Sequence, residues 1–383
     1  MAPLRDVDLG GVAIRGAVEI ERTARRLTPH RLPAWARLQI PDAFMVQTSA
    51  ESAGIRLAFR TAATTLELDV AARRMAPDAA SALPASIWEL TSEGRVVAEA
   101  AAVAGSRYLF TFEDPSGRVI EGPPSTVRFT SLPAVETEYE LWLPFTDAVE
   151  LLALRADAPV APPADRTAVK WVHHGSSISH GYRADSTTGT WPVAAALATG
   201  ADLTNLAFSG SAMLDPFTAR TVRDQPADLI SLKVGINLVN GDVMRMRAFR
   251  PAVDGFLDTL REGHPTAPIV VVSPIFCAPV EDAAGPTVQD PTRSYEWSIA
   301  GGTEAQVAEG KLSLGAIRAA LADIVVRRRA TDPNLHYVDG HDLYGPADAE
   351  RTPLPDNLHP GPDVQRLIAE RFVERVLRPL VWG

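Results

Sequence analysis

The stretch Val169-Lys-Trp-Val-His-His-Gly-Ser-Ser-Ile-Ser179 decides the fold that we predict for the second half of the chain. Its apolar start, Val169–Val172, has the length of a buried strand, and the glycine and serines that follow indicate a turn. Similar apolar runs recur further along the sequence, at Leu203–Phe208, Leu229–Val234, Ile269–Ile275 and Leu335–Val338. Helical patterns separate these runs and follow the last of them, at Trp191–Thr199, Met244–Glu262, Lys311–Arg329 and Pro362–Leu377.

Alternation of strands and helices predicts a parallel sheet covered by helices on both faces. We therefore expect a three-layer α/β/α domain with a five-stranded parallel sheet. In such folds the ligand site lies at the carboxyl ends of the strands.

The first part of the chain has a different pattern. Ile55, Leu57 and Phe59 alternate with polar or small residues, and further short runs of this kind follow, separated by turn signals. This pattern favours a β-sandwich of jelly-roll-like form. The proline-rich segment Ala158–Asp165 reads as a linker, since proline cannot donate to a strand ladder. We thus predict one domain over residues 1–158 and a second domain over residues 166–383.

Composition narrows the classes of function. The 383 residues carry a net charge of −10, which argues against a nucleic-acid partner, because binding phosphates requires a dense basic surface. Cys277 is the single cysteine, so neither an internal disulfide nor a thiolate metal cluster can form. No apolar stretch reaches the ~18 residues of a membrane span, and the start of the chain lacks the basic and apolar pattern of a secretory signal. We expect a soluble, cytoplasmic protein with no membrane partner.

Four short segments have residues suited to acyl-transfer chemistry. Each follows a predicted strand or lies in a terminal loop, so all four can meet at one edge of the sheet. They are Gly175-Ser-Ser-Ile-Ser179, Asn205-Leu-Ala-Phe-Ser-Gly210, Gly235-Ile-Asn237 and Asp356-Asn-Leu-His359. Taken singly, each is also compatible with an ordinary turn or a helix cap. Their order and contexts together favour a catalytic site.

The chemistry assigns a role to each segment. Ser177 is the predicted nucleophile, His359 its general base, and Asp356 the carboxylate that fixes the imidazole tautomer. The Ser177 and Gly210 N–H groups and the Asn237 amide are the predicted donors to the oxyanion. Because position 179 is serine, the first segment is not the Gly-x-Ser-x-Gly elbow of an α/β-hydrolase.

In this order, the four segments resemble the conserved blocks of the SGNH (GDSL) hydrolase family. Ser177, Gly210, Asn237 and His359 supply the four letters, and the resemblance extends from Val169 to the end of the chain. It implies a flavodoxin-like, five-stranded, three-layer fold and serine-dependent acyl transfer. It thereby makes residues 166–383 the catalytic domain and residues 1–158 an accessory, substrate-contacting domain. Ser176 and Leu238 depart from the family pattern, in which aspartate is common at both places.

The whole-chain arrangement is similar to a small group of two-domain acyltransferases in antibiotic biosynthesis. The segments that carry this similarity are Glu138–Pro144, Gly175–Gly181 and Asp356–His359. It implies transfer of an acyl group, such as salicylyl, from a coenzyme A thioester to a hydroxyl of a polyketide-type small molecule, with no bound cofactor. An ester hydrolase or carbohydrate deacetylase, which passes the acyl group to water, is the alternative.

Other features leave alternatives open. The segment Cys277–Thr303 is long for a loop and is a candidate lid or binding wall, in which Tyr295 and Trp297 either stack on a planar substrate or anchor the loop. Two alternative functions remain, a non-catalytic carbohydrate-binding protein and a metal enzyme. Of these, we do not expect a metal site. The candidate ligands for a metal are His173, His174, His180, Asp339, His341 and Asp342.

Overall fold

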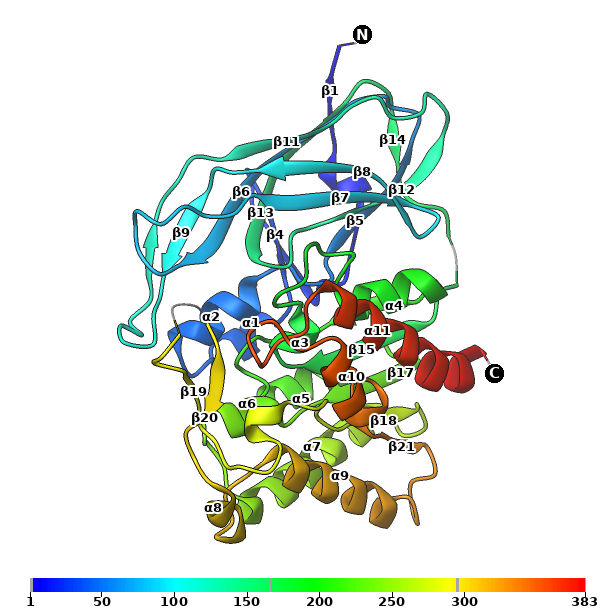
Figure 1. Ribbon diagram of the computed structural model, residues 1–383. Helices are drawn as coiled ribbons and strands as arrows, with labels where there is room; N and C mark the ends of the chain where they lie inside the picture. The colour runs from blue at the N-terminus through cyan, green and yellow to red at the C-terminus, as the bar shows by residue number, and fades with distance from the viewer. Residues whose placement is uncertain (1–2, 166, 294–295, 383) are drawn as a thin grey trace. The chain divides into compact units, whose positions relative to one another are not determined.

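The computed structural model describes residues 3–165, 167–293 and 296–382 (Figure 1). The chain forms two compact units. The first comprises Met1–Ala168 with the short segments Ser186–Thr188 and Ala196–Asn205, and the second comprises Val169–Asp185, Gly189–Ala195 and Leu206–Gly383.

The first unit consists mainly of strands. Its elements are β1 (Arg5–Val7), η1 (Leu9–Gly11), β2 (Ala13–Arg15), β3 (Glu19–Arg22), β4 (Leu27–His30), α1 (Ala34–Arg37), α2 (Ala43–Ala50), β5 (Arg56–Thr61), β6 (Leu66–Ala76), β7 (Ser86–Ser92), β8 (Arg95–Ala102), β9 (Ser106–Leu109), β10 (Arg118–Ile120), β11 (Ser125–Phe129), β12 (Thr137–Trp142), β13 (Asp147–Ala156) and β14 (Val160–Ala161).

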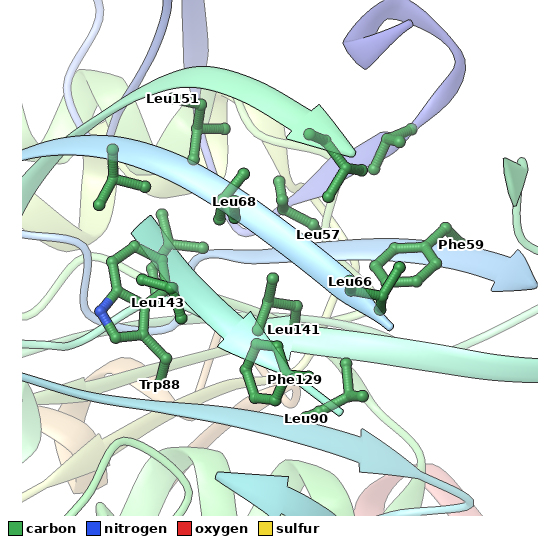
Figure 2. Close-up of a cluster of buried hydrophobic side chains, with 14 of the residues drawn as sticks. Leu57, Phe59, Leu66, Leu68, Trp88, Leu90, Phe129, Leu141, Leu143 and Leu151 are labelled. Atoms are coloured by element: carbon green, nitrogen blue, oxygen red, sulfur yellow. The ribbon is translucent and has the colours of Figure 1, made fainter. Parts of the chain in front are cut away.

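These strands form two sheets that share one core. The described strands of one sheet run β10-β9-β6-β13-β4-β3, with β1 on β13 and β11 on β6; those of the other run β14-β5-β12-β7-β8, with β2 on β5. Leu57 of β5, Leu68 of β6 and Leu141 of β12 belong to a single buried cluster filled from both sheets (Figure 2). The alternating pattern thus places its apolar side chains between the sheets, and the predicted β-sandwich is confirmed.

Helix α2 was not predicted from the sequence. Its eight residues mix apolar, β-branched and small polar side chains, and no apolar stripe of period 3.6 stands out. The helix begins where Asp42 caps it, with the Asp42 carboxylate accepting the Met45 N–H at 2.8 Å. A local cap, rather than the periodicity, is the signal that indicates this helix.

From residue 169 onward, strands and helices alternate. The elements are β15 (Lys170–Gly175), α3 (Ser177–His180), α4 (Trp191–Thr199), β16 (Asp202–Asn205), α5 (Pro216–Arg223), β17 (Leu229–Lys233), α6 (Ile236–Asn240), α7 (Met246–Gly263), β18 (Ile269–Val272), η2 (Ala278–Val280), β19 (Thr287–Gln289), β20 (Ser298–Ala300), α8 (Glu304–Ala308), α9 (Leu314–Arg328), β21 (Leu335–Val338), η3 (Gly340–Asp342), α10 (Pro346–Arg351), α11 (Pro362–Phe372) and η4 (Val373–Trp382).

The central sheet has the strand order β16-β15-β17-β18-β21 among the described residues. The neighbours β15 and β17, β17 and β18, and β18 and β21 are parallel. The predicted five-stranded α/β domain is therefore confirmed. Strand β18 ends at Val272, earlier than the apolar run to Ile275 suggests, because Pro274 interrupts the run and lacks the N–H that a ladder needs.

Helices cover both faces of this sheet. On one face Trp171 stacks on Phe372 of α11, with ring centroids 5.2 Å apart, and His173 packs edge-on against Trp191 of α4. On the other face His174 stacks on Phe256 of α7. Neighbouring residues of β15 thus point to opposite faces, as the strand period requires. No helix in the described part of the chain combines the length and apolar character needed to cross a membrane.

Candidate active site

Ser177 lies directly after β15, on the first turn of α3. Ser176 caps this short helix, its hydroxyl accepting the Ile178 N–H at 3.4 Å. Serine and aspartate are both good caps, so the departure from the family pattern at Ser176 keeps a capping side chain. After α3 the chain folds back, and the N–H groups of Gly181 and Tyr182 both donate to the Ser177 carbonyl. The serine is thereby held between a strand end and a tight turn.

Asp356 and His359 share one turn before α11. The Asp356 Oδ1 accepts the N–H groups of Leu358 (3.0 Å) and His359 (2.7 Å), and Asn357 adopts a left-handed backbone with φ +63°. This geometry brings the other carboxylate oxygen, Oδ2, to 2.9 Å from His359 Nδ1. The three-residue spacing is thus what lets the carboxylate reach the ring of its own turn.

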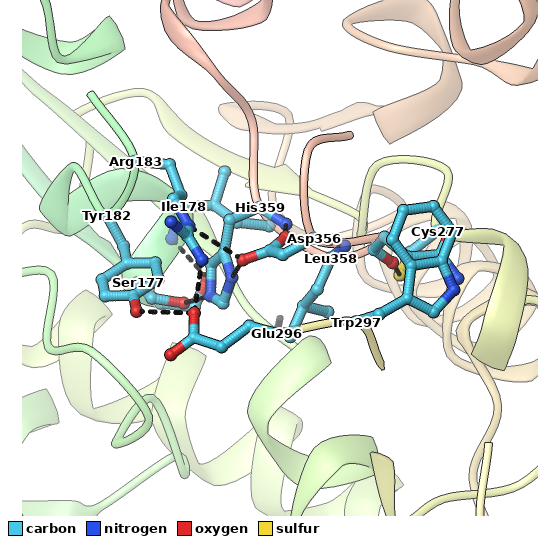
Figure 3. A network of polar contacts seen from close by, with 12 residues as sticks. Ser177, Ile178, Tyr182, Arg183, Cys277, Glu296, Trp297, Asp356, Leu358 and His359 are labelled. Carbon is cyan, nitrogen blue, oxygen red and sulfur yellow. Dashed lines mark hydrogen bonds and ion pairs between the residues drawn. The ribbon is translucent and has the colours of Figure 1, made fainter. Parts of the chain in front are cut away.

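The structure brings Ser177 to this turn from 182 positions earlier in the chain (Figure 3). The Ser177 Oγ lies 2.9 Å from His359 Nε2. When Nδ1–H donates to the carboxylate, Nε2 is free to accept the hydroxyl proton. The three side chains therefore have the arrangement that a serine nucleophile, a general base and an orienting carboxylate require.

Asp356 is buried, and burial by itself raises the pKa of a carboxyl group. Hydrogen bonds and charge from His359, with a further hydrogen bond from Arg183, outweigh this and hold the pKa of Asp356 well below its ordinary value. Asp356 is therefore a carboxylate at neutral pH and can stabilise a positive imidazolium beside it.

Hydrogen bonds connect the segments that carry the three predicted oxyanion donors. The N–H of Ser209, next to Gly210, donates to His180 Nδ1 at 3.2 Å, and His180 belongs to the same helix as Ser177. Two residues after Gly210, the Ala212 N–H donates to Asn237 Oδ1 at 3.0 Å. With its oxygen committed to this bond, the Asn237 side chain has its Nδ2 group to offer a ligand.

Two glycines permit this arrangement. Gly210 has φ +65°, in the left-handed region that glycine adopts without strain. Gly235, the residue before α6, has φ +127°, and a Cβ there would meet the Ile317 side chain at 2.8 Å. The tight turn at Gly235 positions α6 and hence Asn237.

Several residues around His359 were missed by sequence reasoning. The Tyr182 ring lies against the His359 ring, with centroids 4.5 Å apart, and the Arg183 Nε donates to Asp356 Oδ2 at 3.1 Å. Glu296 forms an ion pair with Arg183. Proximity to Ser177 in the sequence is a signal that could have pointed to Tyr182 and Arg183. Glu296 lies 60 residues before Asp356 in the printed sequence and no motif marks it.

The long segment Cys277–Thr303 contains the hairpin of β19 and β20. The Ser298 N–H donates to the Asp356 carbonyl at 2.9 Å, and the Asn357 side chain donates back to the Ser298 carbonyl at 2.8 Å. The Trp297 ring lies 4.0 Å from the Arg293 guanidinium carbon and is drawn well away from Ser177 in Figure 3. Tyr295 lies outside the described residues.

The alternative metal ligands are dispersed. His173 Nδ1 is 2.7 Å from the Ser231 hydroxyl, and His174 Nδ1 is 2.7 Å from the Leu206 carbonyl on the opposite face. His180 accepts from Ser209, and Asp339 accepts the His341 N–H. Within the described ranges no group of three or more His, Cys, Asp or Glu side chains is arranged to hold a metal ion. Burial raises the pKa of the Cys277 thiol, so this cysteine is not a reactive thiolate.

The model of the GDSL-like lipase/acylhydrolase family matches residues 174–367, which begin in β15 before Ser177 and extend past His359. The chain belongs to this family. Membership makes it an enzyme of the GDSL hydrolase and acyltransferase type. A comparison with curated proteins finds no match.

Solved structures similar to this family member cover both of its units. A salicylyl-acyltransferase, SsfX3, from a tetracycline biosynthetic pathway superposes with a TM-score of 0.80 at 25% identity, over 99% of this chain and 98% of that one. A GDSL-like lipase from Bacteroides ovatus gives 0.69 at 17% identity, over 99% and 98%. A family two carbohydrate esterase from Clostridium thermocellum gives 0.59 at 14% identity, over 87% and 94%. The last two show a shared fold.

If Asn237 is the predicted oxyanion donor, replacing it with alanine lowers kcat by a factor of about 10² to 10³, because the developing oxyanion then loses one hydrogen bond. KM should change little, since the oxyanion forms only in the transition state. Hydrolysis of a p-nitrophenyl ester measures both constants. Asn334→Ala, which removes an exposed amide bonded to the Thr266 carbonyl, is the matched control. An unchanged kcat in Asn237→Ala would show that Asn237 does not donate to the oxyanion.

Proposed function

We propose that this protein is a serine acyltransferase that moves an acyl group, aryl in character such as salicylyl, from a coenzyme A thioester to a hydroxyl of a polyketide-type small molecule. The observation that carries the proposal is the contact of Ser177 Oγ with His359 Nε2 at 2.9 Å, backed by the Asp356 carboxylate. The similarity along the whole chain to a salicylyl-acyltransferase supports the choice of reaction.

The mechanism has two halves. The Ser177 Oγ attacks the thioester carbonyl while its proton passes to His359 Nε2, and the imidazolium is stabilised by Asp356. The oxyanion accepts hydrogen bonds from the Ser177 and Gly210 N–H groups and from Asn237. Collapse expels the coenzyme A thiolate, which takes up the proton held by the His359 imidazolium, and leaves an acyl-serine and a neutral His359. His359 then removes the proton of the acceptor hydroxyl as its oxygen attacks the acyl carbonyl, and the serine leaves with that proton.

Transfer to a hydroxyl and hydrolysis differ only in the acceptor of the second half. Similarity at 25% identity over nearly the full length of both chains favours transfer. The carbohydrate esterase similarity, at 14% identity, supports the fold but not deacetylation. We therefore place ester hydrolysis second and deacetylation of carbohydrate behind it.

The test is incubation of the pure protein with a panel of acyl-coenzyme A thioesters, with and without hydroxyl acceptors of polyketide and sugar type. Mass spectrometry of the intact protein should show one acyl group on Ser177 without acceptor, and its loss with formation of an ester when the right acceptor is added. Free acid as the main product at saturating acceptor would overturn transfer in favour of hydrolysis. Absence of any acylated protein would overturn the proposal as a whole.

We further propose that the segment Cys277–Thr303 forms part of the acceptor site, because its Glu296 pairs with Arg183 and its Ser298 is hydrogen-bonded to the turn that carries His359. Trp297→Ala is then expected to raise the acceptor KM about tenfold, the size of one lost aromatic contact, and to leave the rate of acyl-enzyme formation unchanged. Single-turnover acylation and steady-state transfer measure the two effects separately. Trp35→Phe, a change on an exposed ring of the first unit, is the control. An acceptor KM equal to that of the unmodified protein would show that Trp297 only anchors its loop.

A further inference from the structure

Asp356 has a second side-chain partner besides His359, the permanently charged Arg183. Its Oδ2 atom accepts from His359 Nδ1 at 2.9 Å and from Arg183 Nε at 3.1 Å, while Oδ1 accepts two backbone N–H groups. One carboxylate oxygen thus accepts hydrogen bonds from both the imidazole and a permanently charged guanidinium. In the proposed mechanism the whole negative charge of Asp356 would otherwise be available to the imidazolium.

The guanidinium is in turn compensated. Arg183 forms an ion pair with Glu296, and the Tyr182 hydroxyl donates to the same carboxylate at 3.4 Å (Figure 3). The Arg183 guanidinium carbon lies 5.4 Å from the centre of the Tyr182 ring, and that ring packs on His359. Asp356, Arg183 and Glu296 therefore form an alternating row of charges, minus, plus, minus, that ends at the imidazole.

Backbone geometry fixes this row in place. Arg183 has φ +69°, a conformation that a non-glycine residue adopts at a cost, and it follows the turn closed on the Ser177 carbonyl. Ser298, two residues after Glu296, donates its N–H to the Asp356 carbonyl, and its own carbonyl accepts from the Asn357 side chain. Both ends of the ion pair are thus tied to the segments that carry Ser177 and Asp356.

We propose that Arg183 and Glu296 are a pair of positioning residues that sets the pH range in which His359 can accept the Ser177 proton. The positive charge of Arg183 reduces the electrostatic stabilisation that Asp356 gives the His359 imidazolium. The negative charge of Glu296 offsets part of this reduction. The inference rests on the proposed function, because it gives His359 the role of general base.

The charges that face His359 define the expected signs. Asp356 lies on its own turn, Tyr182 and Arg183 on the turn after α3, and Glu296 on the segment before β20. The three charged groups sum to one negative charge. Without Arg183 the sum is two negative charges, which favours the imidazolium; without Glu296 it is zero, which disfavours it.

The test compares Arg183→Gln, Glu296→Gln and the double variant by the pH dependence of kcat/KM for a p-nitrophenyl ester. A protonated imidazole cannot take the serine proton, so activity falls on the acid side. We expect the midpoint of this fall to move up by about half a pH unit in Arg183→Gln and down by about half a unit in Glu296→Gln. In the double variant, where the sum returns to one negative charge, it should lie close to that of the unmodified enzyme.

A purely structural role makes a different prediction. Both single variants would then lose rate without moving the midpoint, and the double variant would be worse than either, which would overturn the proposal. Arg250→Gln, which breaks an exposed pair with Asp323, is the matched control and should leave the profile unchanged. If Arg183→Gln fails to fold, Arg183→Lys tests the same point: it retains the charge, so its midpoint should stay in place, and a displaced midpoint would contradict the inference.

A second readout separates this inference from the proposed function. The rate at which an organophosphonate labels Ser177 also requires an unprotonated His359, and it needs no acyl donor or acceptor. The protein could transfer no acyl group from coenzyme A and still show labelling midpoints that move as expected. That outcome would support the role of the Arg183–Glu296 pair and exclude the proposed acyl donor. A protein whose Ser177 is not labelled at any pH would reject the nucleophile, and the inference with it.

Discussion

Replacing Ser177 with alanine is expected to lower kcat for ester hydrolysis or acyl transfer by a factor of about 10⁴ to 10⁶. The substitution removes the only atom that can form the acyl-enzyme in the proposed mechanism and leaves His359, Asp356 and the oxyanion donors in place. The residual rate then comes from binding and oxyanion stabilisation alone. Stopped-flow and steady-state assays with a p-nitrophenyl ester cover this range, and intact-protein mass spectrometry should find no acyl adduct.

The neighbouring serine gives a matched control. Ser179 lies on the same short helix as Ser177 and is also buried, so Ser179→Ala makes the same chemical change two residues away. It should still react with an organophosphonate in a one-to-one ratio, whereas Ser177→Ala should not react. Melting temperatures of the two variants show whether either change has disturbed the fold. Retention of more than about a tenth of the activity in a folded Ser177→Ala protein would exclude Ser177 as the nucleophile.

The fold could be predicted from the sequence because its signals are local. The run Ile269–Val272 is apolar throughout, as a strand covered on both faces requires, and Leu66, Leu68 and Val70 alternate as a half-buried strand does. Where a local signal is weak, prediction fails. Strand β10 has three residues, two of them exposed, and its place is set by pairing with β9. Such pairing depends on contacts that the sequence of the strand alone does not specify.

In the candidate site, too, the residues with a local sequence signal could be predicted and those that depend on distant contacts could not. Ser177, Asp356 and His359 could be chosen because each stands in a short segment with a recognisable chemical role. The chemistry of Tyr182 and Glu296 gives no such indication, since a tyrosine and an exposed glutamate are ordinary surface residues. Their significance lies in long-range contacts, with the His359 ring and the Arg183 guanidinium. For Tyr295 the predicted substrate contact stays a prediction.

Asp356→Asn is expected to reduce kcat by about 10³ to 10⁴, although the substitution hardly changes the shape of the side chain. The reason lies in the donors that surround it. The N–H groups of Leu358 and His359 point at the Oδ1 position, so the amide oxygen of the asparagine must occupy it. The amide nitrogen then takes the place of Oδ2.

At that position the new NH₂ group faces His359 Nδ1 and Arg183 Nε, both of which donate to Asp356 in the unmodified protein. Nδ1 can bond to it only as an acceptor, which moves the ring proton to Nε2 and leaves no lone pair for the Ser177 hydroxyl. The arginine N–H loses its acceptor as well. Rates of acylation at several pH values measure the loss, with Asp323→Asn, an exposed partner of Arg250, as the control. A tenfold loss or less would show that Asp356 shapes the turn without directing the His359 proton.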